Sequence, residues 1–369
     1  MRRNRPIEES GLMNLHLQSK KVDTLHPTDI LFQTNYWSRV KCRLGWNAMA
    51  FDVCFQTVKK GDILVLIGSA RDDLKIAYVP QGPEFEPDAE MYGTFLEILS
   101  QALKQYLDSS VAVIRYDLPW KSQYAIDFKS GKFGLEHPSA RLRELRMNIG
   151  TQTWHLRKAP LDLTVADTLI IDLTRSREDI LAAMKPKTRY NIKLSRRKGV
   201  CIFDASIENL PLFYELYLQT AERNGFKASG YVHFDALFSS LDCKTDSVEI
   251  FFLLAKQGMD TLTGAIIAIS GRRASYLFGA SSNQGRHLMA PYVLHWEVIK
   301  RVQKKGCLTY DMGSVSPSAD PNHPFYGMYR FKTGFGGEIV HLNGSWDYPL
   351  DDRRYEDLRN YESFIAVNS

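Results

Sequence analysis

The stretch Thr261–Gly279, TLTGAIIAISGRRASYLFG, decides the fold class. It holds two apolar runs of the length and composition of β-strands, and the dipeptide Gly271-Arg272 between them suits a tight turn. A third run, Val248–Leu254, comes directly before this pair. We therefore expect three strands that meander through one sheet.

A helix and one further strand follow the meander. Met289–Gln303 has apolar residues at helical spacing, with Pro291 tolerated in the first turn, and Leu308–Met312 has the composition of a strand. The first half of the chain shows the same succession in the segments Ala48–Val58, Asp62–Gly68, Lys75–Val79, Asp88–Leu107 and Val111–Tyr116. The order predicts a duplicated α+β unit of the acyltransferase type rather than a doubly wound sheet. No repeat is visible residue by residue.

The boundary between the two halves falls where the pattern weakens, after a short basic helix predicted at Ala140–Met147. We expect a first domain over 28–160, completed by part of 340–369, and a second domain over 161–340. A helix at Thr28–Trp46, capped by Thr28 or Asp29, opens the first domain. Lys59-Lys60-Gly61 is the turn expected between its first two strands.

Composition points to a globular enzyme. The 369 residues are 44% hydrophobic and 24% charged, and no apolar run approaches the roughly 20 residues of a membrane span. The N-terminal residues lack the apolar core of a secretory signal, so we expect a cytoplasmic protein. The five cysteines are scattered and odd in number, which argues against a disulfide framework or a zinc site. We expect no metal, no cofactor and a monomer.

The segment Lys185–Val200, KPKTRYNIKLSRRKGV, carries seven of the basic residues and no acid, while the whole chain is only +5. As a helix from Lys187, it would present a cationic stripe suited to successive phosphates, while Tyr190, Ile192 and Leu194 pack inward. Charge alone fits a solvated helix face equally well.

Six segments resemble, in order, the Fem family (FemABX) of nonribosomal peptidyltransferases. They are AYVPQGP (77–83), VIRYDLP (113–119), MKPKTRYNIKLSRRKGV (184–200), GASSNQGRHLMAPYVLHWEVIK (279–300), YDMG (310–313) and YRFKTGFGG (329–337). The resemblance covers roughly residues 30 to 350. It implies two tandem GNAT-like domains, and the short distance between the basic helix and the next one implies that this chain lacks the coiled-coil arm of some members.

The resemblance also implies an activity. Fem enzymes transfer an aminoacyl group from aminoacyl-tRNA to the stem-peptide amine of a peptidoglycan precursor, either UDP-MurNAc-pentapeptide or lipid II, to form interpeptide bridges. With lipid II as acceptor, a peripheral contact with the membrane is implied. An aminoacyl ester is already activated, so positioning, oxyanion stabilisation and proton removal suffice without an acyl-enzyme.

Site residues follow from the same motifs. Lys332 matches the lysine near the tetrahedral intermediate, and Asp117 matches an aspartate proposed as base, to which we give less weight. The motif Trp37-x-x-x-Lys41 supplies a lysine for the precursor diphosphate. A second phosphate ligand, an arginine in the family, is missing here. In place of that arginine we expect Lys227 and Tyr231 at the substrate, and beside Asp117 and Lys332 we expect Tyr116 and Phe331. The residues expected to contact tRNA are Lys187, Arg189, Lys193, Arg196 and Arg197.

Two other classes stay open. An acyl-CoA-dependent N-acyltransferase would share the fold, but Ser282–Ala290 has a single glycine in the wrong register for a pyrophosphate loop. A non-catalytic RNA-binding module would use the basic helix, but no aromatic stacking platform is evident.

Overall fold

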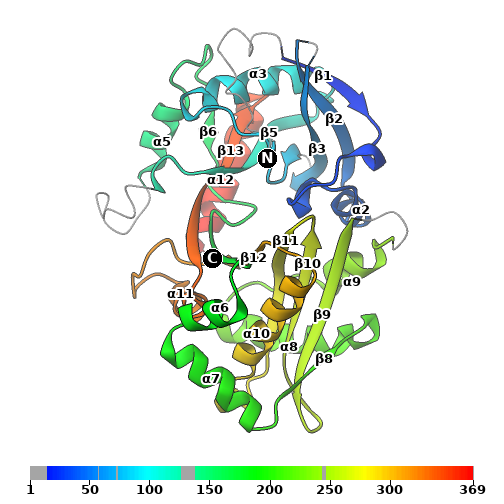
Figure 1. Ribbon diagram of the computed structural model, residues 1–369. Helices are drawn as coiled ribbons and strands as arrows, with labels where there is room; N and C mark the ends of the chain where they lie inside the picture. Colours follow the sequence, from blue (N-terminus) through cyan, green and yellow to red (C-terminus); the bar gives the residue numbers. More distant parts are fainter. Residues whose placement is uncertain (1–14, 57, 72–73, 126–137, 243–246, 369) are drawn as a thin grey trace. The chain divides into compact units, whose positions relative to one another are not determined.

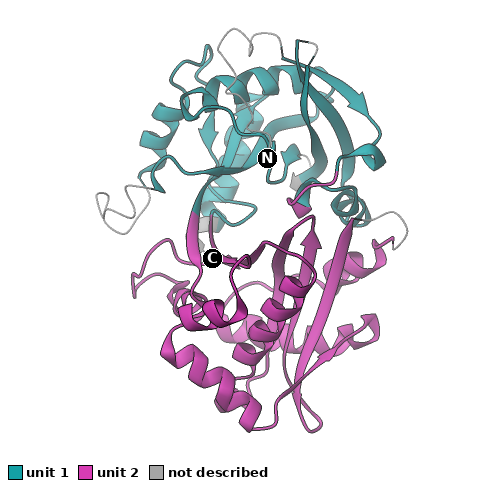
Figure 2. Cartoon of the chain, in the orientation of Figure 1, with its two compact units in different colours: residues 1–26, 32–166, 341–369 teal, residues 27–31, 167–340 magenta. Residues whose placement is uncertain are grey.

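The computed structural model describes residues 15–56, 58–71, 74–125, 138–242 and 247–368. The chain divides into two compact units (Figure 2): unit 1 comprises 1–26, 32–166 and 341–369, and unit 2 comprises 27–31 and 167–340. The C-terminal segment thus returns to the unit that contains most of the N-terminal half.

Unit 1 is built on a mixed sheet in the order β1-β2-β3-β4-β5-β13, with β6 paired to β13. Neighbouring strands are antiparallel except β4 and β5, which are parallel because α3 connects them. The strands are β1 (Leu15–Lys20), β2 (Asn47–Phe55), β3 (Val58–Arg71), β4 (Leu74–Val79), β5 (Val111–Lys121), β6 (Arg157–Lys158) and β13 (Glu338–Pro349, whose first residues belong to unit 2).

The helices of unit 1 are α2 (Asn35–Arg43), α3 (Tyr92–Lys104), α5 (Ala140–Met147) and α12 (Asp352–Asn368). Helix α3 buries Phe95, Leu96 and Leu99 against the sheet, and these apolar positions recur at helical spacing. Helix α12 contributes Tyr355 and Leu358 to a second cluster of buried residues with β3, β4 and β5.

Unit 2 repeats this arrangement. Its sheet has the order β7-β12-β11-β10-β9-β8, and its parallel pair, β11 and β12, is connected through α10 (Figure 1). The strands are β7 (Asp167–Asp172), β8 (Cys201–Asp204), β9 (Val248–Gln257), β10 (Asp260–Ser270), β11 (Arg273–Ser281) and β12 (Thr309–Ser314). The predicted duplicated α+β architecture is confirmed.

Six helices belong to unit 2: α6 (Arg177–Ala183), α7 (Pro186–Arg197), α8 (Leu210–Asn224), α9 (Tyr231–Ser239), α10 (Ala290–Lys304) and α11 (Tyr326–Lys332), counted over its described residues. Ser176 caps α6 through Asp179 N, at 3.1 Å, and Pro186 occupies the first turn of α7. The chain passes from α7 through β8 to α8, and these residues, all of them described, contain no inserted coiled-coil arm.

Short 3-10 turns join several of these elements, at Val22–Thr24, Leu31–Gln33, Ala89–Met91, Ile207–Asn209, Arg286–Leu288 and Thr333–Phe335. None of the helices within the described ranges is both long and apolar enough to cross a bilayer.

Several local predictions were wrong. The first helix is capped by Thr34, whose hydroxyl accepts from Trp37 N at 3.2 Å, because Leu31–Gln33 forms a separate 3-10 turn. Lys59 pairs with Cys54 inside the β2–β3 ladder, so the hairpin reverses before the predicted turn. The strand β1 and the helix α9 were not predicted.

Candidate active site

Lys332 is the last residue of α11 and is buried, with 4% of its surface exposed. Its Nζ donates to the carbonyl oxygen of Ser314 at 2.7 Å and lies 5.6 Å from the centre of the Tyr276 ring. Burial lowers the pKa of Lys332 to about 8, against the opposing charge of Asp311. No carboxylate forms an ion pair with Lys332 within the described part of the chain, so its charge is held by a carbonyl dipole and an aromatic face.

The end of β12, which carries Ser314, is fixed by Asp311 in the middle of the same strand. Asp311 accepts from Thr168 Oγ1 on β7, from Arg273 Nη2 on β11 at 2.5 Å and from Gly313 N at 2.8 Å. Gly313 has a φ of 72°, a left-handed conformation that favours glycine. Asp311 therefore ties three strands together and sets the carbonyl that receives the lysine.

The other wall around Lys332 is aromatic and uncharged. His295 on α10 is buried, and its Nδ1 lies 2.9 Å from the hydroxyl of Tyr310. Burial, and secondarily the charge of Lys332, lower the pKa of His295 to about 3, so the imidazole is neutral at physiological pH. The ring of Tyr276 packs on His295 at 4.8 Å, and burial raises the pKa of Tyr276.

Phe331, predicted beside Lys332, is half-buried and packs on His295 at 5.5 Å and on Tyr292 at 5.0 Å. Position 279 requires glycine for a steric reason, because a Cβ there would lie 1.4 Å from the hydroxyl oxygen of Tyr276. Ser314, Tyr276 and His295 were not predicted as site residues. Only the tertiary structure brings them to Lys332. Of the three, Ser314 directly follows the YDMG motif.

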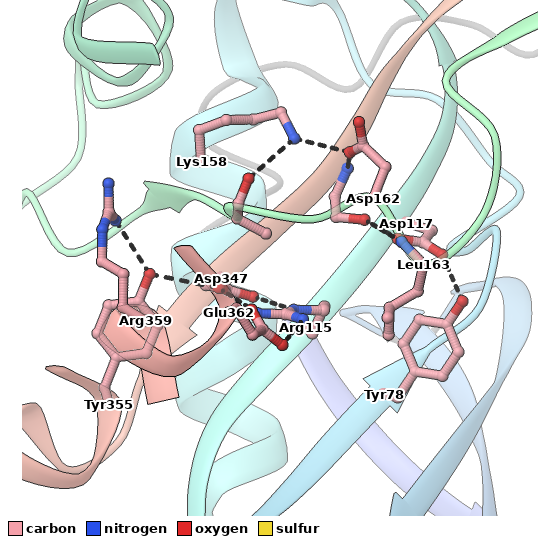
Figure 3. Close-up of polar contacts among 12 residues, drawn as sticks. Tyr78, Arg115, Asp117, Lys158, Asp162, Leu163, Asp347, Tyr355, Arg359 and Glu362 are labelled. Carbon is pink, nitrogen blue, oxygen red and sulfur yellow. Dashed lines mark hydrogen bonds and ion pairs between the residues drawn. The ribbon is translucent and has the colours of Figure 1, made fainter. Parts of the chain in front are cut away.

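Asp117, the second predicted catalytic residue, is 1% exposed on β5 of unit 1. Its two carboxylate oxygens accept from Tyr78 Oη on β4 and Ser345 Oγ on β13 (Figure 3 shows Asp117 and Tyr78). Burial raises the pKa of Asp117, and the hydroxyl donors, Ser345 first, oppose that rise. A carboxylate occupied on both oxygens is suited to holding strands in place more than to accepting a substrate proton.

Trp37 and Lys41, from the predicted acceptor motif, lie on α2 of unit 1. The Nζ of Lys41 lies 5.6 Å from the ring centre of Trp37 and 5.1 Å from that of Trp46. Burial lowers the pKa of Lys41 and the charge of Asp117 opposes the shift. Over the described residues no carboxylate forms an ion pair with Lys41, and the buried Trp37 Nε1 has no hydrogen-bond partner. A cation supported by indole faces remains available for an anion.

A buried polar network stabilises β5 next to Asp117 (Figure 3). Arg115 binds Asp347 through two bonds of 2.6 and 2.8 Å and Glu362 of α12 through two bonds of 2.7 Å. Lys158, 6% exposed, binds Asp162 at 2.7 Å. These charged groups are compensated by partners, so we interpret them as structural.

The other predicted substrate residues lie in different settings. Tyr116 has no exposed surface, and its hydroxyl forms a hydrogen bond of 2.8 Å with Ser100 Oγ of α3. We therefore do not propose Tyr116 as a substrate contact. Lys227 is exposed, and Tyr231 is 38% exposed at the start of α9, with its ring edge-to-face on Tyr214 at 5.3 Å. Both belong to unit 2 and are open to ligands.

The basic helix α7 has its polar face outward, but one residue was misplaced. Tyr190 is 56% exposed, contrary to the prediction, because Thr188, Asn191, Ile192 and Ser195 form the buried face. The basic residues that are exposed on α7 are Lys187, Lys193, Arg196 and Arg197. Arg189 is half-buried, and its Nη1 donates to the carbonyls of Ala182 at 2.9 Å and Met184 at 2.6 Å, which gives it a structural role at the end of α6.

The two units repeat one α+β arrangement, and unit 2 contains the buried Lys332. The FemAB family model matches residues 21–260 and 240–361. The chain belongs to the FemAB family, and its enzyme class is that of an aminoacyltransferase. The fold, the family and the enzyme class predicted from the sequence are confirmed.

Relatives and solved structures agree with this assignment. The chain is 22% identical to a lipid II:glycine glycyltransferase of Staphylococcus epidermidis, over 89% of this chain and 90% of that protein. For a Staphylococcus aureus protein of the same name the values are 22%, 93% and 94%. A match of 24% to the Staphylococcus haemolyticus protein spans 51% of this chain and 60% of that one.

Among solved structures, FemX is similar with a TM-score of 0.69 and 18% identity, over 92% of this chain and 96% of that chain. A tandem GNAT protein from the clavulanic acid pathway has a TM-score of 0.52 and 10% identity, over 91% and 98%. At these identities the likeness concerns the fold.

Proposed function

We propose that the protein transfers an aminoacyl group from aminoacyl-tRNA to the stem-peptide amine of a peptidoglycan precursor, in the cytoplasm and as a monomer. The observation that carries the proposal is the buried ammonium of Lys332, which has no carboxylate partner among the described residues, in a family whose relatives include lipid II:glycine glycyltransferases. The acceptor is UDP-MurNAc-pentapeptide or its lipid-linked form, lipid II, and the product begins an interpeptide bridge.

Lys332 is proposed to stabilise the oxyanion. The acceptor amine attacks the ester carbonyl, a C–N bond forms, and the carbonyl oxygen becomes negative in the tetrahedral intermediate. An ammonium has three N–H donors, and the Ser314 carbonyl takes one of them. Collapse of the intermediate breaks the ester C–O bond, and the proton lost by the amine ends on the ribose oxygen. A charge fixed in a buried, aromatic setting needs little reorganisation as the oxyanion forms.

The acceptor would be held through its diphosphate by Lys41 on α2. Its ammonium lies over two indole rings and has no carboxylate partner among the described residues, so a phosphate would be its counterion. Near it, the buried indole N–H of Trp37 has no hydrogen-bond partner among the described residues and is proposed as a second donor. Lys227 and Tyr231 are proposed as further contacts of the precursor, because both are exposed on unit 2.

Helix α7 is proposed to contact the tRNA. Lys187, Lys193, Arg196 and Arg197 are exposed, whereas Arg189 is bonded to backbone carbonyls. Contacts of this kind bind successive phosphates without reading bases, so binding should weaken with salt.

The deciding experiment incubates the purified chain with radiolabelled aminoacyl-tRNAs and, in parallel, with the nucleotide-linked and lipid-linked precursors. Transfer of label to either precursor supports the proposal. Turnover of acetyl-CoA or another acyl-CoA without transfer from tRNA would overturn the proposal and would favour an acyl-CoA-dependent N-acyltransferase. Binding of tRNA without transfer to any acceptor would favour the non-catalytic RNA-binding module.

A further inference from the structure

Helix α5 of unit 1 has an apolar stripe that faces solvent. Leu142 is 45% exposed, Leu145 48% and Ile149, just after the helix, 63%. At about 100° per residue, these three side chains fall within one narrow arc of the helix. The opposite side is buried through Met147. A helix with one face in the core and a second apolar face in water has an interaction surface that the fold does not use.

Arginines flank this stripe on both sides. By the same helical spacing, Arg141 lies beside Leu145, and Arg146 lies beyond Leu142, and both are exposed. Arg146 lies over the ring of Tyr124 at 5.2 Å, and Arg143 donates to the Asn343 carbonyl at 2.7 Å. Arg143, Arg146 and Ile149 line an open hollow that also contains one acidic side chain, Glu90. The charge of this surface is complementary to an anionic partner.

The loop after α5 is held rigid and displays a tryptophan. Asn148 bonds to Leu156 through both its side-chain atoms, at 2.9 and 3.1 Å, and Glu97 accepts from Gln152 N at 2.7 Å and from Thr153 N at 2.8 Å. Trp154 in this loop is 49% exposed, with a φ of 55°. A left-handed, non-glycine residue with a large solvent-facing ring is costly, and such positions cluster at functional surfaces.

We propose that α5 and the loop to Trp154 dock unit 1 onto an anionic phospholipid surface. The three apolar side chains enter the headgroup boundary, and the exposed Arg141 and Arg146 meet the lipid phosphates. An apolar stripe between arginines and an exposed tryptophan in the following loop supply the apolar, basic and aromatic side chains that interfacial segments use. A stable protein interface needs about 800 Å² from each partner, more than these few side chains offer.

Docking to a lipid surface would favour a lipid-linked acceptor, and only this consequence rests on the proposed function. Lipid binding itself requires neither tRNA nor transfer. Failure of vesicle binding and failure of aminoacyl transfer are therefore separate results.

The test is co-sedimentation of the full chain with vesicles of phosphatidylcholine, with and without phosphatidylglycerol. The chain should bind the anionic vesicles, and the variant Leu142→Gln/Leu145→Gln/Ile149→Gln should bind at least about tenfold more weakly. Arg141→Gln/Arg146→Gln should lose binding mainly at low salt, and the matching lysine variant should restore it. A control variant, Leu218→Gln/Val232→Gln/Met259→Gln, changes three apolar residues of unit 2 that are 43%, 54% and 97% exposed, and it should bind like the parent chain.

Thermal melts check that each variant is folded. Fluorescence quenching by brominated lipid should be smaller in Trp154→Phe than in the parent chain. The proposal is overturned if the parent chain does not bind anionic vesicles, or if the α5 variant binds as well as its control. A dimer in sedimentation equilibrium that the same α5 substitutions abolish, without vesicle binding, would instead assign the surface to a second copy of the chain.

Discussion

The two units contain the same arrangement of polar side chains on corresponding strands of their sheets. The strand after the connecting helix contains a Tyr-Asp pair in each, Tyr116-Asp117 in β5 and Tyr310-Asp311 in β12. Each tyrosine hydroxyl bonds to that helix: Tyr116 to Ser100 at 2.8 Å, and Tyr310 to His295 at 2.9 Å. The duplication is thus visible at the level of residues once the strands are aligned.

The aspartates also correspond. Asp117 accepts from Tyr78 of the parallel neighbouring strand, and Tyr78 pairs with residue 115, two positions before Asp117. Asp311 accepts in the same way from Arg273, which pairs with residue 309, two positions before Asp311. Each aspartate also accepts from a hydroxyl on the antiparallel neighbouring strand, Ser345 in one unit and Thr168 in the other. The carboxylate therefore belongs to the scaffold in both units, because it joins three strands.

The buried lysines are where the units differ. Lys158 of unit 1 lies 2.7 Å from the carboxylate of Asp162, whereas Lys332 of unit 2 donates to a neutral carbonyl. Burial lowers the pKa of both. A compensated charge stabilises a fold, and an uncompensated one is stored for a ligand or a transition state. This difference supports the proposal that Lys332 of unit 2 acts in the transfer reaction.

The largest expected effect is on turnover. Lys332→Met should lower kcat by at least about 100-fold, since one donor to an oxyanion is worth that much, while precursor binding changes little. Lys158→Met is the matched control and should retain kcat per folded molecule. Radiolabel transfer and equilibrium binding measure the two quantities. Equal losses of kcat and affinity in Lys332→Met would make Lys332 a binding residue and remove the distinction between the lysines.

Exchange of each scaffold aspartate comes next. Asp311→Asn removes the charge that raises the pKa of Lys332 and leaves Arg273 without its partner, so we expect roughly tenfold slower turnover near pH 8. Asp117→Asn should lower turnover less than about threefold, with a lower melting temperature because a hydroxyl loses its acceptor. Abolished turnover in a fully stable Asp117→Asn would instead assign Asp117 as the base.

The pH profile tests the charge on Lys332. Because the proposed mechanism uses the ammonium form of Lys332 and its pKa is about 8, kcat/KM should decline above that pH, up to about tenfold per unit. Lys332→Arg keeps a charge that does not titrate in this range, so its residual activity should show no such decline. A decline of the same size in Lys332→Arg would trace the titration to another group.

The smallest effects concern stability, and their signs differ. Between pH 8 and 10.5 the unfolded chain binds more protons at Lys332 than the folded chain, so stability rises with pH there, and the cost of burial is fully present below pH 8. Lys332→Met should remove that cost, worth at most roughly 3 kcal/mol, less the loss of the Ser314 hydrogen bond.

Lys158→Met should do the opposite and destabilise by about 1–3 kcal/mol, because Asp162 loses its counterion. Urea unfolding at pH 7 and 9 measures both variants. Destabilisation by both substitutions would show that Lys332 is as structural as Lys158.

Much of the fold and part of the site could be predicted from local pattern. Strand and helix segments carry their own periodicity, and α5 was predicted with its observed bounds at Ala140–Met147. Lys332 was found through a motif, since it lies in one short segment. Its partners Tyr276, His295 and Ser314 come from three other segments, and no local signal links them.

The sequence by itself determined the element order, the basic segment and the family motifs, because each depends on neighbours along the chain. Only the tertiary structure decided which charges are compensated: Arg189 bonds to carbonyls of the preceding helix, Asp117 to hydroxyls of two strands, and Lys332 to no carboxylate in the described residues. Burial and pairing depend on residues far apart in the chain, and these set the pKa and the chemistry of a charged side chain.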